Sequence, residues 1–195
     1  MAPLQGMSAM RDDDGTWSGL EAWLQRAFAG QMRKHGLEAV AWHSIRIGRR
    51  LRNDGADSIT VFGGYAHDVM EDVREFKAAA PQVRREMLMP VAMAALGDRG
   101  RAEEGVLLAE ACTYSHAEYA LPKAERKAVA CARWLASGDI RLLLVKRADV
   151  EDNRTDCARV SPQFEADYLS WAAPFHAGLC QRIAELRGSG PAPRA

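Results

Sequence analysis

The residues best suited to chemistry lie in the segment His67-Asp68-Val69-Met70-Glu71-Asp72. If one helix covers this segment, His67 and Glu71 lie one turn apart, and so do Asp68 and Asp72. The neighbouring residues are apolar or small, which predicts that this helix is largely buried. Burying several carboxylates without a cation is costly or forces them to take up protons. The segment therefore indicates a site for a divalent metal ion.

Two further segments offer ligands of the same kind. Asp149 and Asn153 lie one helical turn apart after the apolar run 142–145, so we expect a buried helix that ends in a carboxylate and an amide. His43 lies in the mostly apolar segment Trp42-His43-Ser44-Ile45, where an imidazole needs a partner. Two imidazoles and two carboxylates suit a Mn, Fe or Zn ion, with coordination positions left for water and a substrate oxygen.

A metal ion in such a site lowers the pKa of its water and polarises a phosphoryl oxygen. Glu71 and Asp72 exceed what the ion needs and are free to act as acid or base groups. Each residue also has a purely structural interpretation. A buried His is commonly a hydrogen-bonded core residue, an acidic helix face is commonly solvated, and an Asp at a helix end is commonly a cap. The joint spacing of the three segments favours the metal site.

Helices must position these groups, because apolar residues recur at steps of three and four along most of the chain. Asp57 precedes one run as a candidate N-cap. The stretch 140–146 is the one candidate strand, but an isolated strand leaves its backbone groups unpaired, so we interpret it as a buried helix. We expect an all-α bundle of about eight to ten helices. It forms one domain over residues 17–187, with flexible termini at 1–16 and 188–195.

The composition excludes several classes of protein. The 195 residues include 26 basic and 26 acidic side chains, and this balance argues against a nucleic-acid binder. No apolar run has the length of a membrane span, so we expect no membrane partner. The four cysteines are far apart and are expected to be reduced, which predicts a cytoplasmic protein. The balance leaves room for a small charged substrate, and the question of an oligomer stays open.

Several motifs resemble the HD superfamily of metal-dependent phosphohydrolases. Within it they are similar to the small alarmone hydrolases, the stand-alone relatives of the RelA/SpoT hydrolase domain. The similar segments follow the family's order from about Ala27 to Leu186. They are Gly30-Gln31-Met32-Arg33-Lys34, His43, the HDxxED motif at 67–72, Leu121-Pro122-Lys123-Ala124-Glu125-Arg126-Lys127, Lys146-Arg147-Ala148-Asp149 with Asn153, and Tyr168-Leu169-Ser170-Trp171.

The resemblance implies roles for single residues. It implies one Mn²⁺ ion, or another divalent transition metal, held by His43, His67, Asp68 and Asp149. It implies groups that activate and position the attacking water, Glu71 and Asp72, and a contact to the ribose or pyrophosphate, Asn153. It implies a substrate site with a base pocket lined by Arg33 and Lys34, a phosphate contact from Lys123, and a stacking surface on Tyr168. Without the resemblance, the last four residues are equally well explained as surface or core.

The implied reaction removes the 3′-pyrophosphate of the guanosine alarmones ppGpp and pppGpp, giving GDP or GTP and pyrophosphate, as in the stringent response. Two departures from the family pattern keep alternatives open. The segment between Asp72 and Lys123 is longer than usual, and Phe164 stands where relatives often carry a phosphate-contacting Arg. One alternative is an HD phosphatase for another nucleotide, such as NADPH or a deoxynucleotide. The other is a nucleotide-binding module without catalytic activity.

Overall fold

The computed structural model describes residues 14–33 and 38–188, and it confirms the expected all-α fold. Eight of the helices have nine or more residues: α1 (Asp14–Ala27), α2 (Val40–Asn53), α3 (Ser58–Ala66), α6 (Pro81–Leu96), α7 (Arg99–Cys112), α9 (Lys123–Leu135), α10 (Ile140–Val160) and α11 (Pro162–Gly188). Three have four or five residues: α4 (Val69–Asp72), α5 (Arg74–Ala78) and α8 (His116–Tyr119). The one β-bridge among the described residues joins Met32 to Ala39. The predicted domain bounds, 17–187, stay a prediction.

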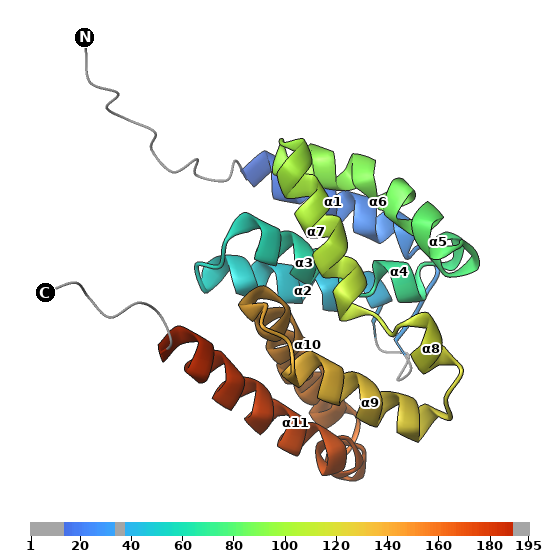
Figure 1. Ribbon diagram of the computed structural model, residues 1–195. Helices are drawn as coiled ribbons and strands as arrows, with labels where there is room; N and C mark the ends of the chain where they lie inside the picture. The colour runs from blue at the N-terminus through green and yellow to red at the C-terminus, as the bar shows by residue number, and fades with distance from the viewer. Residues whose placement is uncertain (1–13, 34–37, 189–195) are drawn as a thin grey trace, which may run out of the picture.

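Helices α2 and α3 lie in the middle of the bundle (Figure 1). On one side α1 contacts α2 and α6, and α7 packs on α3 and α6. On the other side α10 crosses both α2 and α3, and α11 packs along α10 with α9 beside it. The chain therefore brings α10, far along the sequence, against the two helices that carry His43 and lead into His67. Among the described residues, no helix combines the length and the apolar character needed to cross a membrane.

Helices α2 and α3 approach each other closely because small residues lie where they cross. A Cβ atom added to Gly48 would overlap the ring of Tyr65, and one added to Gly64 would overlap Leu51. Tyr65 is fully buried and stacks on Trp17 of α1, with ring centroids 5.5 Å apart. This tight crossing holds the His43 face of α2 beside the end of α3.

The end of α3 differs from the expectation of one helix through residues 67–72. Helix α3 starts where predicted, since the Asp57 side chain accepts hydrogen bonds from the backbone N–H groups of Ile59 and Thr60. It ends at Ala66, and a separate turn of helix, α4, begins at Val69. His67 Nδ1 bonds to the Gly64 carbonyl at 2.9 Å, so the side chain occupies an acceptor of the last turn. His67 and Asp68 therefore lie at a junction between two helices.

Helix α10 confirms that 140–146 is helical but is longer than expected. It begins after Asp139, whose side chain caps the Arg141 N–H, and it continues to Val160, well past Asn153. The expectation that the helix ends at this pair is therefore wrong. Because the helix continues past Asn153, Asp156 joins three other polar residues on the face that meets α2: Asp149, Asp152 and Asn153.

Candidate metal centre

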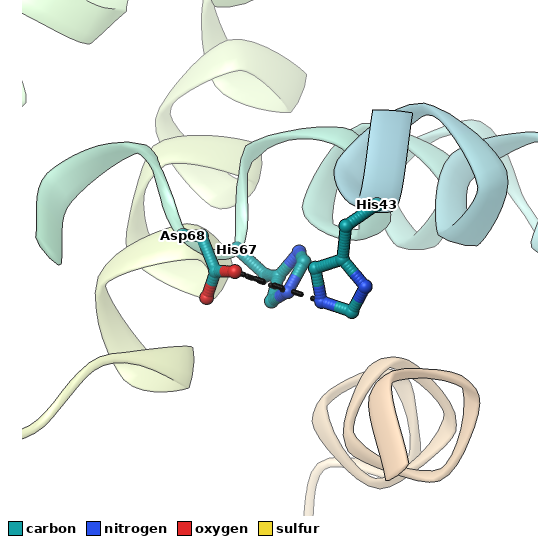
Figure 2. A group of neighbouring side chains, drawn as sticks. All are labelled: His43, His67 and Asp68. Carbon is teal, nitrogen blue, oxygen red and sulfur yellow. Dashed lines mark ion pairs between the residues drawn. The ribbon is translucent and has the colours of Figure 1, made fainter. Parts of the chain in front are cut away.

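Side chains from three places in the chain converge between α2, α10 and the α3–α4 junction. His43, His67 and Asp68 each offer one ligand atom, and these three atoms lie within 4.8 Å of one another (Figure 2). His67 Nε2 lies 3.1 Å from Asp68 Oδ2, and His43 Nε2 lies 3.7 Å from the same oxygen. Asp149 Oδ1, from α10, lies 3.3 Å from His43 Nε2 and 3.9 Å from His67 Nε2. Asp149 thus lies close to both imidazoles, beside the group formed by His43, His67 and Asp68.

The Nδ1 atom of each imidazole, which points away from the cluster, already has a hydrogen-bond partner. His43 Nδ1 lies 2.7 Å from Asp152 Oδ2, and His67 Nδ1 lies 2.9 Å from the Gly64 carbonyl. Since both partners are acceptors, each Nδ1 carries the proton, and in the neutral ring each Nε2 carries a lone pair. His67 Nε2 is buried and without a hydrogen-bond donor, even though it lies 3.1 Å from the Asp68 carboxylate. Two such electron-rich atoms are held together stably only when a cation or a proton lies between them.

The spacing of these atoms fits a metal ion. Ligand atoms about 2.1 Å from one ion lie about 3.0 to 3.5 Å apart at bond angles of about 90 to 110°. Of the four distances between imidazole and carboxylate atoms, 3.1 and 3.3 Å lie within that range, and 3.7 and 3.9 Å lie above it. Two nitrogen and two oxygen donors suit Mn, Fe or Zn. The chemistry of these donors therefore fits a divalent transition metal, and the donor atoms would have to move closer together to bind one ion.

The electrostatics of the cluster also favour a positive charge. Burial lowers the pKa of His43, but Asp149 and Asp152 raise it more strongly, to about 9. Burial raises the pKa of the Asp68 carboxyl, yet His67 and His43 bring it down to about 2. The carboxylates of Asp68 and Asp149 therefore stay ionised at neutral pH. They attract either a proton on the imidazole or a metal ion.

The carboxylate of Asp149 is held from two sides. Asn153 Nδ2 donates to its Oδ1 at 2.6 Å, while the buried Lys146 places Nζ 3.5 Å from its Oδ2 and 4.2 Å from the Trp134 ring centroid. Burial lowers the pKa of Lys146, but Asp149 and the other nearby acids raise it above its ordinary value, so Lys146 stays charged. A fixed cation thus lies beside the candidate metal ligands.

Glu71 and Asp72 differ in their surroundings. Glu71 is partly buried, and burial, followed by Asp68 and Asp72, raises its pKa to about 7. Its neighbours include the Tyr119 hydroxyl and the Tyr114 backbone, both from the long segment before α9. Asp72 is exposed. Glu71 therefore has the pKa that proton transfer near neutral pH requires.

The structure places the residues implied for substrate binding unevenly. Arg33 reaches the site, because its Nη2 donates to Asn153 Oδ1 at 2.6 Å and lies 3.2 Å from Asp156 Oδ2. The Tyr168 hydroxyl donates to the Val150 carbonyl at 3.1 Å, and burial raises its pKa, with Asp149 as the next cause. Tyr168 therefore lies on the site side of α11.

Lys123 and Lys34 are not joined to this site by any described contact. Lys123 is the exposed first residue of α9. Lys34 lies outside the described residues. A surface pocket of about 550 Å³ lies beside α10, but its lining includes none of the predicted site residues.

Three residues around the cluster had no predicted role. Asp152 follows Asp149 by three positions, so a signal was present in the helical spacing of the acidic residues. Lys146 directly follows the apolar run 142–145. A charged residue next to a buried apolar run is unusual, and this was the available signal. Tyr119 carries no such signal, because its approach to Glu71 depends on how the segment 113–122 folds back.

No protein-family model matches this chain, and no curated protein matches it in sequence. Among solved structures, the chain is similar to that of a metazoan ortholog of SpoT, a protein described as hydrolysing ppGpp and acting in starvation responses. The identity is 20% and the TM-score 0.64, and the match covers 91% of this chain and 97% of the other. The resemblance inferred from short motifs is thus confirmed at the level of the whole fold, which this chain shares with that protein.

Proposed function

We propose that this chain is a metal-dependent hydrolase that releases pyrophosphate from the 3′ position of guanosine alarmones. The observation that carries the proposal is the convergence of four side chains able to bind a metal ion, His43, His67, Asp68 and Asp149, between α2, α10 and the α3–α4 junction. The shared fold supports the substrate class, because the similar metazoan protein is described as hydrolysing ppGpp. In this proposal the four residues hold Mn²⁺ or a similar ion.

A bound ion of this kind would acidify a water molecule and polarise the phosphoryl oxygen. The residues of the chain then have separate tasks. Glu71, with a pKa of about 7, accepts the proton of the attacking water, and the neighbouring carboxylate of Asp72 orients that water. Lys146 keeps Asp149 oriented toward the two imidazoles.

Substrate binding falls to residues around the opening of the site. Arg33 and Asn153 form a hydrogen-bonded pair that reaches Asp149, so a ribose or pyrophosphate oxygen bound there lies next to the ligands. Tyr168 offers an aromatic face for the base, and Lys34 and Lys123 supply positive charge for the nucleotide. A nucleotide of this kind is intracellular, so the proposal includes the cytoplasmic location expected from the sequence.

The test is a metal-supplemented assay of purified protein. Protein loaded with Mn²⁺ should convert ppGpp to GDP and pyrophosphate, whereas His67→Ala and Asp68→Ala should each reduce turnover to background. His176→Ala is the matched control, because this histidine bonds to Glu151, away from the cluster. If folded, metal-loaded protein gives no turnover with Mn, Fe, Co or Zn, the proposal is wrong and a binding module remains.

A second candidate is an HD phosphatase for another nucleotide, such as NADPH or a deoxynucleotide. The observation that favours it is Phe164, an apolar side chain that is 42% exposed one turn before Tyr168. An apolar group at that place gives no charged contact to a second phosphate cluster. A higher kcat/KM for such a nucleotide than for ppGpp would favour this candidate.

A further inference from the structure

The carboxylate of Asp152 makes the shortest contact of the His43 imidazole. Its Oδ2 lies 2.7 Å from His43 Nδ1, and the imidazole is 1% exposed. His67 differs here, because its Nδ1 bonds to the neutral carbonyl of Gly64. A carboxylate partner fixes the tautomer and the ring orientation of an imidazole and makes its other nitrogen a more basic ligand. The two histidines of the cluster are therefore supported by different means.

Asp152 is itself held by a cation. Arg46, one turn after His43 on α2, binds it with two bonds, Nε to Oδ1 at 2.7 Å and Nη2 to Oδ2 at 2.8 Å. Such a paired geometry fixes the plane of a carboxylate as well as its position. The same guanidinium binds Glu38 at 2.6 Å and Asp156 at 3.0 Å. The contact between α2 and α10 thus contains a connected chain from Arg46 through Asp152 to His43.

The donor atoms of His43, Asp152 and Asp156 also lie within 4.8 Å of one another, as the ligands of a second metal ion would. We do not assign a metal to this group, because the Arg46 guanidinium already places positive charge beside both carboxylates and Arg33 adds a second contact to Asp156. Among the described residues these acids are therefore matched by arginines. Asp152 faces the imidazole and the guanidinium at once.

We propose that Asp152 is a positioning residue, which acts through His43 and is fixed by Arg46, and that it raises the affinity of the cluster for a divalent metal ion. The inference rests on the proposed function, because it assigns His43 to a metal. It adds a residue outside the four ligands on which the metal affinity depends. Asp152 holds the Nδ1 proton of His43, so that Nε2, which faces Asp149 and Asp68, is the nitrogen left for a metal ion.

The test measures the binding of Mn²⁺ and Zn²⁺ to the full chain without any substrate. Asp152→Asn should weaken metal binding by about 10- to 100-fold, the usual effect of changing such a supporting carboxylate. Asp156→Asn is the matched control, because Asp156 is equally part of the Arg46 network but has no hydrogen bond to the imidazole. It should change the affinity clearly less than Asp152→Asn does. Circular dichroism and thermal melting establish that each variant is folded.

A second readout separates positioning from general loosening. In zinc-loaded protein, the Nδ1–H proton of His43 should give a protected NMR signal that is lost in Asp152→Ala and kept in Asp156→Asn. Arg46→Lys keeps the charge but loses the two-bond geometry, so it should weaken metal binding relative to the wild-type chain, though less than Asp152→Ala does. This variant also keeps the inference testable if Asp152 variants fail to fold.

Equal effects of Asp152→Asn and Asp156→Asn on metal affinity would overturn the inference, and so would a wild-type chain that binds no divalent metal. Wild-type protein that binds Mn²⁺ in the Asp152-dependent way but leaves ppGpp intact would sustain this inference and contradict the proposed function. The two claims therefore fail on different measurements.

Discussion

His67 Nε2 lies 3.1 Å from Asp68 Oδ2, while Nδ1 of the same ring donates to the Gly64 carbonyl. Two lone pairs at that distance repel each other unless positive charge lies between them. His43 Nε2 lies 3.3 Å from Asp149 Oδ1, where a proton or a metal ion on this nitrogen is attracted by the carboxylate. The cluster therefore favours a positive charge between these atoms.

Metal binding should release a proton. Asp149 and Asp152 hold the pKa of His43 at about 9 against the effect of burial, so without metal the imidazole is charged at neutral pH. Because Nε2 must lose its proton to bind an ion, the affinity for Mn²⁺ should rise by up to about tenfold per pH unit below pH 9. Calorimetry in two buffers with different ionisation enthalpies counts the proton, and an affinity that does not change with pH would contradict this.

The rate of hydrolysis should rise with pH as Glu71 ionises. Burial and the nearby Asp68 and Asp72 raise its pKa to about 7, and a carboxyl acts as a base only when ionised. A bound cation lowers that pKa, so the rising limb of kcat/KM should have an apparent pKa at or below about 7. In Glu71→Gln this limb should disappear together with most of the activity. A variant that keeps the wild-type pH profile would exclude Glu71 as the base.

The same carboxyl should cost stability in the metal-free protein. A folded-state pKa raised from 4.5 to about 7 means that folding favours the neutral form, so stability falls as pH rises through this window. Glu71→Gln removes the charge and should raise Tm at about pH 8, with the gain shrinking toward about pH 4. Melting curves in a chelator measure it, with Glu75→Gln, an exposed residue of α5, as the control. A gain that is equal at both pH values would argue against this origin.

The close crossing of α2 and α3 should tolerate no side chain at Gly48. An added methyl group would meet the ring of Tyr65, which is fully buried against Trp17. Gly48→Ala should therefore destabilise the protein by about 1 to 3 kcal/mol and weaken metal binding, since it moves His43 relative to His67. Gly19→Ala in α1 is the comparison, because nothing lies within 4 Å of its added Cβ. That variant should be neutral or stabilising by up to about 1 kcal/mol.

The sequence predicted much of the fold and the membership of the cluster. Helical periodicity and the Asp57 cap were sufficient for the helices, since both depend on residues close in sequence. The prediction of one helix through residues 67–72 was wrong, because it also used local spacing alone. The His67 side chain binds the Gly64 carbonyl, and helix α3 ends at Ala66. The junction aims both ligands at one point, which a straight helix would not do for adjacent residues.

The supporting residues could not be predicted because they depend on contacts between helices distant in sequence. Asp152 matters only because α10 crosses α2 so that His43 and Arg46 meet it, and helical spacing alone does not give that crossing. Lys146 and Tyr119 likewise acquire their places from the packing of α10 on α3 and from the turn before α9.

The most direct test of the central claim identifies the products by ³¹P NMR when ppGpp is incubated with Mn²⁺-loaded protein. The account predicts one pyrophosphate and one GDP for each ppGpp consumed, with no inorganic phosphate, and no reaction in His67→Ala. Release of single phosphate groups would contradict pyrophosphate hydrolysis. Unchanged ppGpp in the presence of fully metal-loaded wild-type protein would contradict the account as a whole.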